Sequence, residues 1–210
     1  MSAWQGPRAH VPVLEHFGDA ALRARLPEGA PSRAVFEALR ALPGVVDAVV
    51  TERHALVSFD PAAPPGGIGE AIERALSAPA SAAAPRSHSI VVRYDGPDVD
   101  DVARAARMPR DEVIARHTQA VYVVAAIGFV PGFAYLRGID LRLVLPRRAT
   151  PRPRVPAGAV AIAGPYTGVY PFSSPGGWHL LGTATGAPLF DPRSGATLAL
   201  GDRVAFVEAR

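Results

Sequence analysis

The sequence of 210 residues contains no cysteine, no lysine and no asparagine. Without cysteine, the chain has no disulfide framework, no thiolate nucleophile and no cysteine-based zinc site. Without lysine, it offers no Schiff base, no lysine general base and no lysine of a phosphate-binding P-loop. A phosphate or carboxylate ligand must therefore be held by arginine, by backbone N–H groups or by a metal ion.

The chain also lacks long apolar runs and a strong charge of one sign. No apolar run approaches the roughly 20 residues that a membrane-spanning helix needs, and the first eight residues lack the apolar core of a signal peptide. The formal net charge of +3 is too small to indicate a nucleic-acid-binding protein. We therefore expect a cytoplasmic protein that binds neither membranes nor nucleic acid.

The N-terminal part alternates strand-like and helix-like patterns. We predict a strand at residues 10–17, a helix at 32–42 with Ser32 as its N-cap, strands at 45–51 and 55–59, and a helix at 69–77. Strand, helix, strand, strand, helix is most of a ferredoxin-like split βαβ unit. Residues 78–85 are rich in alanine, proline and serine, which is typical of a linker. We place a first domain at residues 1–80.

The second domain is predicted at residues 86–210. It begins with a strand at 89–94, followed by helices at 99–107 and 109–116. From residue 120 the pattern is strand and loop, with a short apolar run at 159–163 and a closing strand at 202–207. Many short strands with glycine- and proline-rich turns indicate a sandwich or a barrel, and the pattern alone does not choose between them.

Four arginines lie within eight positions, in a segment that prolines hold extended; they are Arg147, Arg148, Arg152 and Arg154. Because extended backbone sends alternate side chains to opposite sides, Arg148, Arg152 and Arg154 are expected to share one face. Guanidinium groups suit phosphate or carboxylate ligands. The alternative is that these arginines pair with acids of the same chain or of a partner, and the sequence leaves both readings open.

A second candidate is the segment around Gly176 and Gly177. A glycine pair allows backbone N–H groups to converge on an oxyanion, and Ser174 places a hydroxyl beside it. The strand–turn–helix context of a serine hydrolase is missing. The alternative is therefore a tight turn packed under Trp178. The histidines at positions 10, 16, 54 and 88 show no metal-ligand spacing, so we expect no metal site.

Four motifs in the C-terminal half resemble one family. They are GFVPGFAYL at residues 128–136, PRRATPRPRVPAG at 146–158, TGVYP at 167–171 and SPGGW at 174–178. They are similar to the signatures of the family of the 5-oxoprolinase B-type subunit. That family includes a sporulation-kinase inhibitor and the first half of the carboxyltransferase domain of urea amidolyase, or allophanate hydrolase subunit 1. The resemblance implies an α+β fold, in which a ferredoxin-like α/β sandwich precedes a cyclophilin-like closed β-barrel.

The resemblance also implies site residues. His117, which matches a histidine usual in the family, is a candidate catalytic base or substrate-orienting group; its alternative role is structural, at the C-terminal end of a helix, where a protonated histidine is favoured. The candidate substrate-binding residues are Phe129, Pro131, Gly132, Tyr135, Arg148, Arg152, Arg154, Thr167, Tyr170, Ser174, Gly176 and Gly177.

By the same resemblance, the chain is the B-type subunit of an ATP-dependent 5-oxoprolinase that opens a cyclic amide. ATP is shared with two partners, a homologue of the C type and a protein of the A type. Two alternatives stay open: an inhibitor of a histidine kinase, and half of a biotin-dependent carboxyltransferase acting on urea-type substrates. The chain departs from the family where Tyr166 replaces a glutamine and Thr183 an arginine, which indicates either an altered substrate or a loss of activity.

Overall fold

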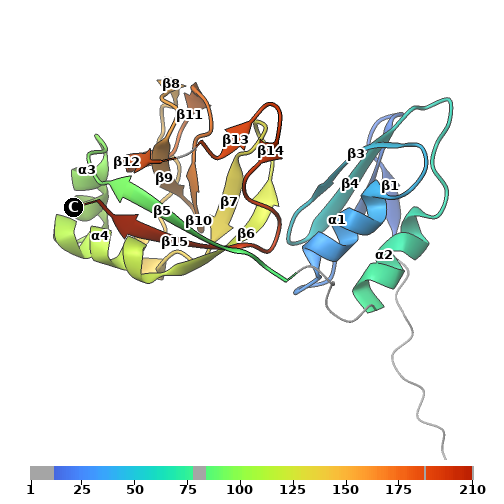
Figure 1. Cartoon of the computed structure of the whole chain (residues 1–210), viewed down its shortest axis with the longest axis horizontal. Helices are drawn as coiled ribbons and strands as arrows, with labels where there is room; N and C mark the ends of the chain where they lie inside the picture. Colours follow the sequence, from blue (N-terminus) through green and yellow to red (C-terminus); the bar gives the residue numbers. More distant parts are fainter. Residues whose placement is uncertain (1–11, 78–83, 187, 210) are drawn as a thin grey trace, which may run out of the picture. The chain divides into compact units, whose positions relative to one another are not determined.

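The computed structural model describes residues 12–77, 84–186 and 188–209. The chain divides into two compact units, residues 1–84 and 85–210 (Figure 1). Most of the predicted linker, residues 78–83, lies outside the described residues. Among the described helices, none combines the length and the apolar character that crossing a membrane requires.

The first unit is a four-stranded antiparallel sheet with two helices. Its strand order is β1-β2-β4-β3. Helix α1 packs against α2 and against strands β3 and β4. The elements are β1 (Leu14–His16), β2 (Ala21–Arg25), α1 (Ser32–Arg40), β3 (Val45–Val50), β4 (His54–Phe59) and α2 (Ile68–Ser77).

The predicted order of strand, helix, strand, strand, helix is confirmed, but its first strand was misplaced. That strand is β2, whereas the described part of the predicted strand is β1, an added edge strand that pairs with β2. Ser32 is not an N-cap either. It is the first helical residue, and its hydroxyl donates weakly to the carbonyl of Ala30 at 3.4 Å.

Each helix of the first unit buries one apolar face, and α1 packs against both α2 and the sheet. Helix α1 buries Val35 and Leu39, and α2 buries Ile72, at a spacing that gathers apolar side chains on one side. The central strand β4 buries alternate residues, including Val57 and Phe59, because successive strand side chains point to opposite faces. Apolar patterning of this kind explains why the sequence predicted this layout.

The second unit is a closed barrel of seven strands, in the order β10-β7-β6-β15-β5-β12-β9. Strands β15 and β5 pair in parallel, and the other pairs are antiparallel. The structure thus decides for the barrel and against the sandwich. The barrel strands are β5 (Ser87–Arg93), β6 (Val121–Ile127), β7 (Ala134–Arg137), β9 (Ala159–Ala163), β10 (Tyr166–Val169), β12 (His179–Thr185) and β15 (Arg203–Glu208).

Smaller elements complete this unit. Two helices, α3 (Val99–Ala106) and α4 (Arg110–Gln119), lie between β5 and β6, close to their predicted positions. A short 3₁₀ helix, η1 (Leu141–Leu143), follows β7. Two small sheets lie beside the barrel: β8 (Arg152–Val155) with β11 (Ser174–Gly176), and β13 (Phe190–Asp191) with β14 (Gly195–Ala196).

Strand β9 is buried on both faces. Ile162 pairs with Thr167 and Val160 pairs with Val169, so these four side chains point to the same side. The alanines of β9, Ala159, Ala161 and Ala163, point to the opposite side. There they pack with Val155 of β8 and with a layer of aromatic side chains. The small alanine side chains allow that layer to lie close against the strand.

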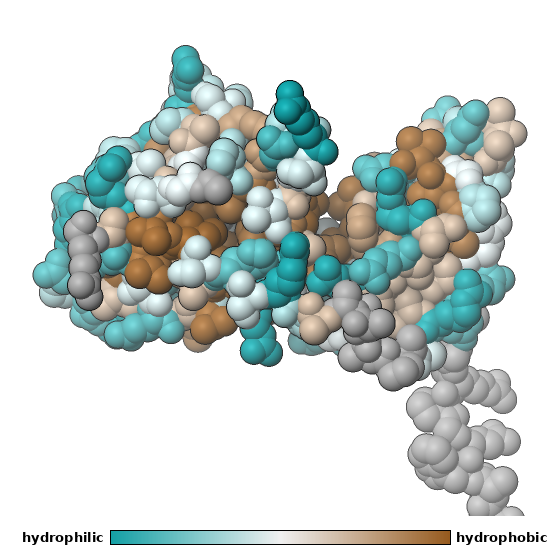
Figure 2. All heavy atoms as spheres, viewed as in Figure 1, coloured by the Kyte–Doolittle hydropathy of each residue, from teal (hydrophilic) through white to brown (hydrophobic). Residues whose placement is uncertain are grey.

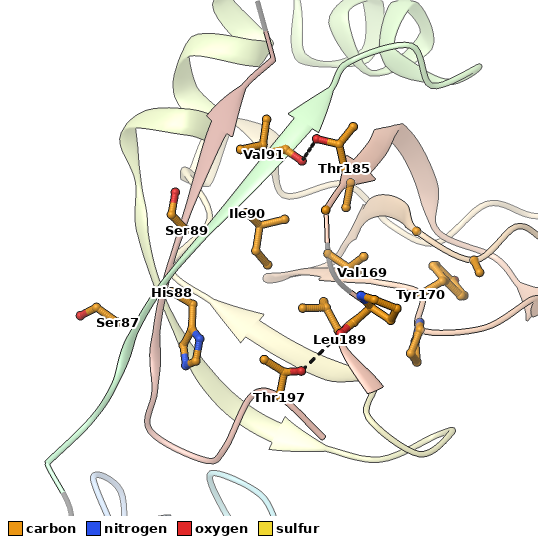
Figure 3. Close-up of a pocket in the computed structure, with 16 residues that line it drawn as sticks. Ser87, His88, Ser89, Ile90, Val91, Val169, Tyr170, Thr185, Leu189 and Thr197 are labelled. Carbon is orange, nitrogen blue, oxygen red and sulfur yellow. Dashed lines mark hydrogen bonds between the residues drawn. The ribbon is translucent and has the colours of Figure 1, made fainter. Parts of the chain in front are cut away.

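Two surface features of the barrel unit are visible in the figures. Exposed valines gather on the neighbouring strands β5, β15 and β6, at Val91, Val207, Val121 and Val123, and Figure 2 shows hydrophobic side chains over β5 and β15. A pocket of about 750 Å³, whose lining includes Val91, opens beside β5, β12 and the segment that follows β10 (Figure 3).

Candidate anion-binding site

The arginine segment, residues 147–154, is held against the barrel by β8 and β11. Ser174 pairs with Val155, and Gly176 pairs with Arg152. The N–H of Arg148 donates to the carbonyl oxygen of Gly177 at 2.8 Å, which extends the contact beyond the strands. Two of the four family-like motifs are therefore side by side in space.

Arg148 and Arg152 converge on one acid, Asp98. Atom Oδ1 of Asp98 accepts hydrogen bonds from Arg148 at 2.9 Å and from Arg152 at 2.7 Å. Atom Oδ2 accepts from the backbone N–H of Leu180 at 2.7 Å. The Asp98 side chain is only 2% exposed, whereas those of Arg148 and Arg152 keep 30% and 23% exposure. A buried carboxylate thus joins the arginine segment to strand β12.

The surroundings of Asp98 keep it ionised. Burial by itself raises the pKa of the carboxyl group. The hydrogen bonds from Arg152 and from the Leu180 N–H, with the charges of both arginines, outweigh burial and hold the pKa below its ordinary value. For Arg148 and Arg152, pairing with an acid of the same chain is therefore what the structure shows.

The other two arginines of the segment lie on the surface. Arg154 donates through Nε to the hydroxyl of Ser173 at 3.0 Å, so it does not share the Asp98 site, contrary to the alternation argument. Arg147 is exposed and forms no ion pair with an acid in the described part of the chain. Its charge acts to lower the pKa of Tyr135 and Tyr170, against the larger effect of burial, which raises both. Arg147 is therefore one guanidinium of the segment with capacity for a ligand; Nε of Arg148 and Nη1 of Arg152 also find no hydrogen-bond acceptor among the described residues.

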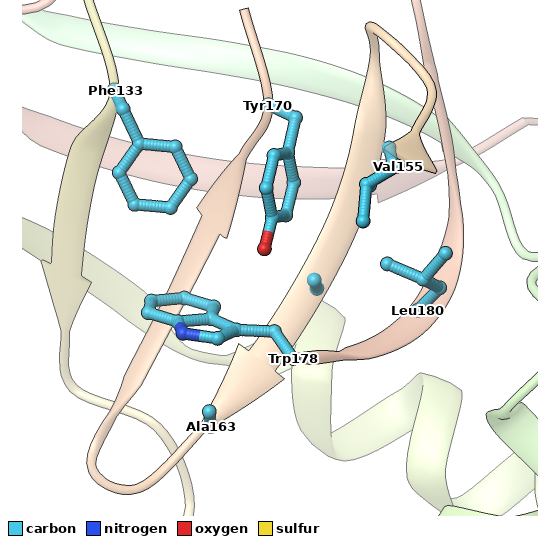
Figure 4. Packing of buried hydrophobic residues seen from close by; sticks show 8 residues of the cluster. Phe133, Val155, Ala163, Tyr170, Trp178 and Leu180 are labelled. Atoms are coloured by element: carbon cyan, nitrogen blue, oxygen red, sulfur yellow. The ribbon is translucent and has the colours of Figure 1, made fainter. Parts of the chain in front are cut away.

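Aromatic rings form a wall under the arginine segment (Figure 4). Phe133 meets Tyr135, Tyr170 and Trp178 edge to face, with ring centroids 5.0–5.4 Å apart. Tyr135 also contacts Tyr166, the residue that stands in place of the family's glutamine. Edge-to-face pairs of this kind fix ring orientation beyond what burial of area alone achieves. The arginine segment thus packs against a layer of aromatic rings whose orientations are fixed by their mutual contacts.

The glycine pair does not form the predicted oxyanion site. Neither Gly176 nor Gly177 has a positive φ. Gly176 lacks a side chain for a steric reason, since an added Cβ would collide with the hydroxyl of Tyr170. The Gly177 carbonyl accepts from the Arg148 N–H, and the Ser174 hydroxyl is enclosed without a hydrogen-bond partner among the described residues. Ser174–Gly176 instead form strand β11, so this geometry supports a packed strand in place of the tight turn.

The loop between β6 and β7 presents a strained aromatic residue. Phe129 has φ +74° and is 60% exposed, a conformation that is unusual for a bulky residue. Pro131 is also exposed. Gly132 is buried at φ +78°, where a Cβ would lie 2.7 Å from that of Phe190. None of these three residues lines the pocket of Figure 3; Phe129 and Pro131 are exposed on the loop, and Gly132 lies against Phe190 of β13.

His117 and Thr167 lie in the interior of the barrel unit. The Thr167 hydroxyl donates to the Ala161 carbonyl at 3.0 Å, so it accepts the 2.8 Å hydrogen bond from His117 Nε2. His117 Nδ1 then accepts from the Tyr94 hydroxyl at 2.6 Å. Phe206 stacks on the imidazole at 4.5 Å. One buried chain of hydrogen bonds thus links the Tyr94 hydroxyl, His117, the Thr167 hydroxyl and the Ala161 carbonyl.

This environment is structural. His117 is fully buried, and burial lowers its pKa to about 3, so the imidazole is neutral at physiological pH. Both ring nitrogens are occupied by protein groups. The geometry therefore favours the structural role of His117 over a catalytic one and gives no support to substrate binding by Thr167. Because the imidazole is neutral, that structural role does not come from a positive charge at the helix end.

Asp98 is the site residue that sequence reasoning missed. It directly precedes α3, where an aspartate is ordinarily read as a helix cap, yet its carboxylate makes no cap hydrogen bond. Its partners are 50 and 54 residues away along the chain. Within the residues that the structure describes, no three His, Cys, Asp or Glu side chains gather to form a metal site.

Comparison with known proteins places this geometry in a family. Residues 13–200 match the family of the carboxyltransferase domain, subdomain C and D. The 5-oxoprolinase B subunit of Bacillus subtilis is 48% identical over 114 residues, which are 53% of this chain and 47% of that protein. The corresponding protein of Escherichia coli O157:H7 is 47% identical over 53% of this chain and 52% of its own. The chain thus spans about half the length of the curated relatives it matches.

Solved structures agree with this assignment. The crystal structure of TTHA0988 is 42% identical with a TM-score of 0.78, covering 90% of this chain and 40% of that one. The uncharacterised protein PH0987 from Pyrococcus horikoshii is 29% identical, with a TM-score of 0.56 over 94% and 97% of the two chains. Kluyveromyces lactis urea amidolyase, at 17% identity and a TM-score of 0.73 over 94% and 15%, shares the fold. The chain belongs to the family of the carboxyltransferase domain, subdomain C and D.

Proposed function

We propose that this chain is the B-type subunit of a 5-oxoprolinase, an enzyme that opens a cyclic amide with the hydrolysis of ATP. The observation that carries the proposal is the 48% identity to the 5-oxoprolinase B subunit of Bacillus subtilis. The arginine site supports it, because a guanidinium on a rigid aromatic base is suited to a small carboxylate.

The chemistry of 5-oxoproline fits the exposed part of this site. The molecule carries one carboxylate and one ring amide. Arg147, which pairs with no acid in the described residues, offers a fork of N–H donors to the carboxylate. Asp98 neutralises part of the charge of Arg148 and Arg152, and so fixes the segment beside Tyr135 and Tyr170. In this proposal, the chain binds and orients the substrate.

The proposal requires partners. His117 is buried and neutral, and the Ser174 hydroxyl is enclosed, so neither is placed to attack or deprotonate a substrate. The relatives are named as one lettered subunit of their enzyme, which indicates a complex. We therefore propose that a C-type homologue and an A-type protein complete the site and share ATP with this chain. Without them, the chain is expected to show no turnover.

The two alternative functions are supported less well. The likeness to urea amidolyase lies at 17% identity and extends to the fold alone. Nothing in the described part of the barrel favours a kinase over other partners. Kinase inhibition and carboxyl transfer are therefore kept as outcomes that the experiment below would reveal.

The test is reconstitution. The chain is co-purified with an A-type and a C-type protein, and 5-oxoproline-dependent ADP release is measured for the complex, for each pair and for the chain alone. The proposal expects ADP release and glutamate formation from the full complex only. A stable complex that consumes urea with biotinylated carrier, or a chain that associates with neither protein, would contradict it.

A further inference from the structure

The pocket of about 750 Å³ shares Tyr170 with the aromatic layer, but its lining includes none of residues 147–154 and has a different chemistry. Its wall is largely apolar, with Ile90, Val169 and Leu189 among the lining residues. Its described lining contains no arginine, aspartate or glutamate. A volume of this size is within the usual range for small-molecule sites.

One side of the pocket contains a histidine, His88, whose ring is held by a hydrogen bond to a buried aspartate. His88 lies on β5 and its Nε2 is 2.9 Å from Oδ2 of Asp202, which is fully buried. Asp202 also accepts from the backbone N–H groups of Arg86 and Ala199, at 3.1 and 3.0 Å. Burial alone raises the Asp202 pKa, but the His88 hydrogen bond, these backbone bonds and the Arg86 charge together lower it. A carboxylate only accepts, so Nε2 of His88 carries a proton.

The direction of the His88 ring follows from the strand. Figure 3 shows His88 and Ile90 on the pocket side of β5, and Ser87 and Ser89 pointing away from it. With Nε2 bound to Asp202, a neutral ring has an unprotonated Nδ1, which is a hydrogen-bond acceptor. The buried aspartate therefore fixes both the orientation and the tautomer of the ring.

The two threonines of the wall are also acceptors. The Thr185 hydroxyl donates to the carbonyl of Val91, and the Thr197 hydroxyl donates to that of Pro188, both at 3.3 Å. Each hydroxyl proton is already donated to a backbone carbonyl, so only the oxygen lone pairs can bind a ligand, as hydrogen-bond acceptors. The Tyr170 hydroxyl lies beside Gly176, in the aromatic layer. The two threonine hydroxyls that line the pocket thus offer acceptors and carry no charge.

We propose that this pocket binds an uncharged ring compound whose polar group is an N–H donor, of the indole or pyrrole class, through a hydrogen bond to Nδ1 of His88. An anion finds no arginine in the described lining and faces the charge of Asp202 behind the histidine. A ligand rich in carbonyl groups finds no side-chain donor. An apolar ring with one N–H satisfies both the wall and the acceptor. The inference does not depend on the proposed 5-oxoprolinase role.

The experiment compares indole with 1-methylindole, which has the same ring without the donor. Binding to the full chain is followed by NMR, using the imidazole nitrogen resonances of His88. Indole is expected to bind about fivefold more tightly, the scale of one neutral hydrogen bond. It is also expected to shift the Nδ1 resonance, whereas 1-methylindole leaves that resonance unchanged.

Two variants separate the hydrogen bond to His88 from the non-specific burial of the probe's apolar ring. His88→Phe keeps a ring in place but removes the acceptor, so it should abolish the difference between the two probes. Ser89→Ala, on the outer side of the same strand, should leave the difference unchanged. Equal binding of both probes to the wild type, or no saturable binding of indole, would overturn the proposal. The wild-type Nδ1 resonance provides the test even if His88→Phe fails to fold.

Discussion

Replacing Asp98 by alanine should destabilise the barrel unit by about 3 kcal/mol. The carboxylate is 2% exposed and accepts hydrogen bonds from Arg148, Arg152 and the Leu180 N–H. Removing one partner of a buried ion pair costs about 3–5 kcal/mol. We take the lower end because the two arginine side chains keep 30% and 23% exposure, so water hydrates them in the variant. Most of the loss then comes from the unpaired Leu180 N–H, at about 1–3 kcal/mol.

The assay is urea unfolding followed by the fluorescence of Trp178, which is 5% exposed in the barrel unit. The sequence has one other tryptophan, Trp4, which is replaced by phenylalanine in every variant so that the signal reports on one unit. Arg154→Ala is the matched control, because that side chain is exposed and its removal should change stability by no more than about 0.5 kcal/mol.

The effect should depend on pH with a defined sign. The pKa of Asp98 is lowered in the folded state, so its contribution is present above the ordinary value of 3.8 and is lost as pH falls through the lowered value. The difference between wild type and Asp98→Ala should therefore shrink below about pH 4. A loss under about 1 kcal/mol at neutral pH, or a difference that is constant down to pH 2, would refute the assignment of Asp98 as a buried carboxylate.

Two further predictions concern buried groups. The folded-state pKa of His117, about 3, lies below its ordinary 6.5, so the unfolded state binds more protons between these values and stability falls with decreasing pH, by up to about 1.4 kcal/mol per unit. Urea unfolding of His117→Gln between pH 6.5 and 4.5 should show a shallower slope than wild type, and an equal slope would speak against a neutral buried imidazole. Gly176→Ala should cost about 1–3 kcal/mol because the new Cβ meets the Tyr170 hydroxyl, and Tyr170→Phe in the same chain should recover part of that cost. Full additivity of these two changes would place the hydroxyl elsewhere.

Local features of the fold were predictable from the sequence. Strand β9 has the predicted bounds, Ala159–Ala163, because Gly158 and Gly164 enclose its apolar run. Strand β2 was missed because its five residues, ALRAR, consist of alanine, leucine and arginine, and alanine and charged side chains have little preference for strands. Closure of the barrel depends on pairings between distant strands, such as β15 with β5, which no local pattern contains.

The candidate site was predictable in composition but not in arrangement. The cluster of arginines was visible, yet the alternation rule chose Arg148 and Arg154 over Arg147. That rule applies to regular strands, and β8 begins only at Arg152, so it does not decide between Arg147 and Arg148. Within β8 it does not say which group a long side chain reaches: Arg152 binds Asp98, whereas Arg154 binds Ser173. Asp98 could not be identified as a partner, because its arginines lie 50 and 54 residues further along the chain.

The central claim is that Arg147 of this chain binds the carboxylate of 5-oxoproline within the reconstituted complex. The most direct measurement is the KM for 5-oxoproline and for ATP with Arg147→Ala, compared with Arg203→Ala, an exposed arginine on β15. Loss of a charge-assisted hydrogen bond of about 1.5–3 kcal/mol predicts a KM for 5-oxoproline raised by roughly 10- to 150-fold, with the KM for ATP unchanged. An unchanged KM for 5-oxoproline, or an equal effect of Arg203→Ala, would contradict the account.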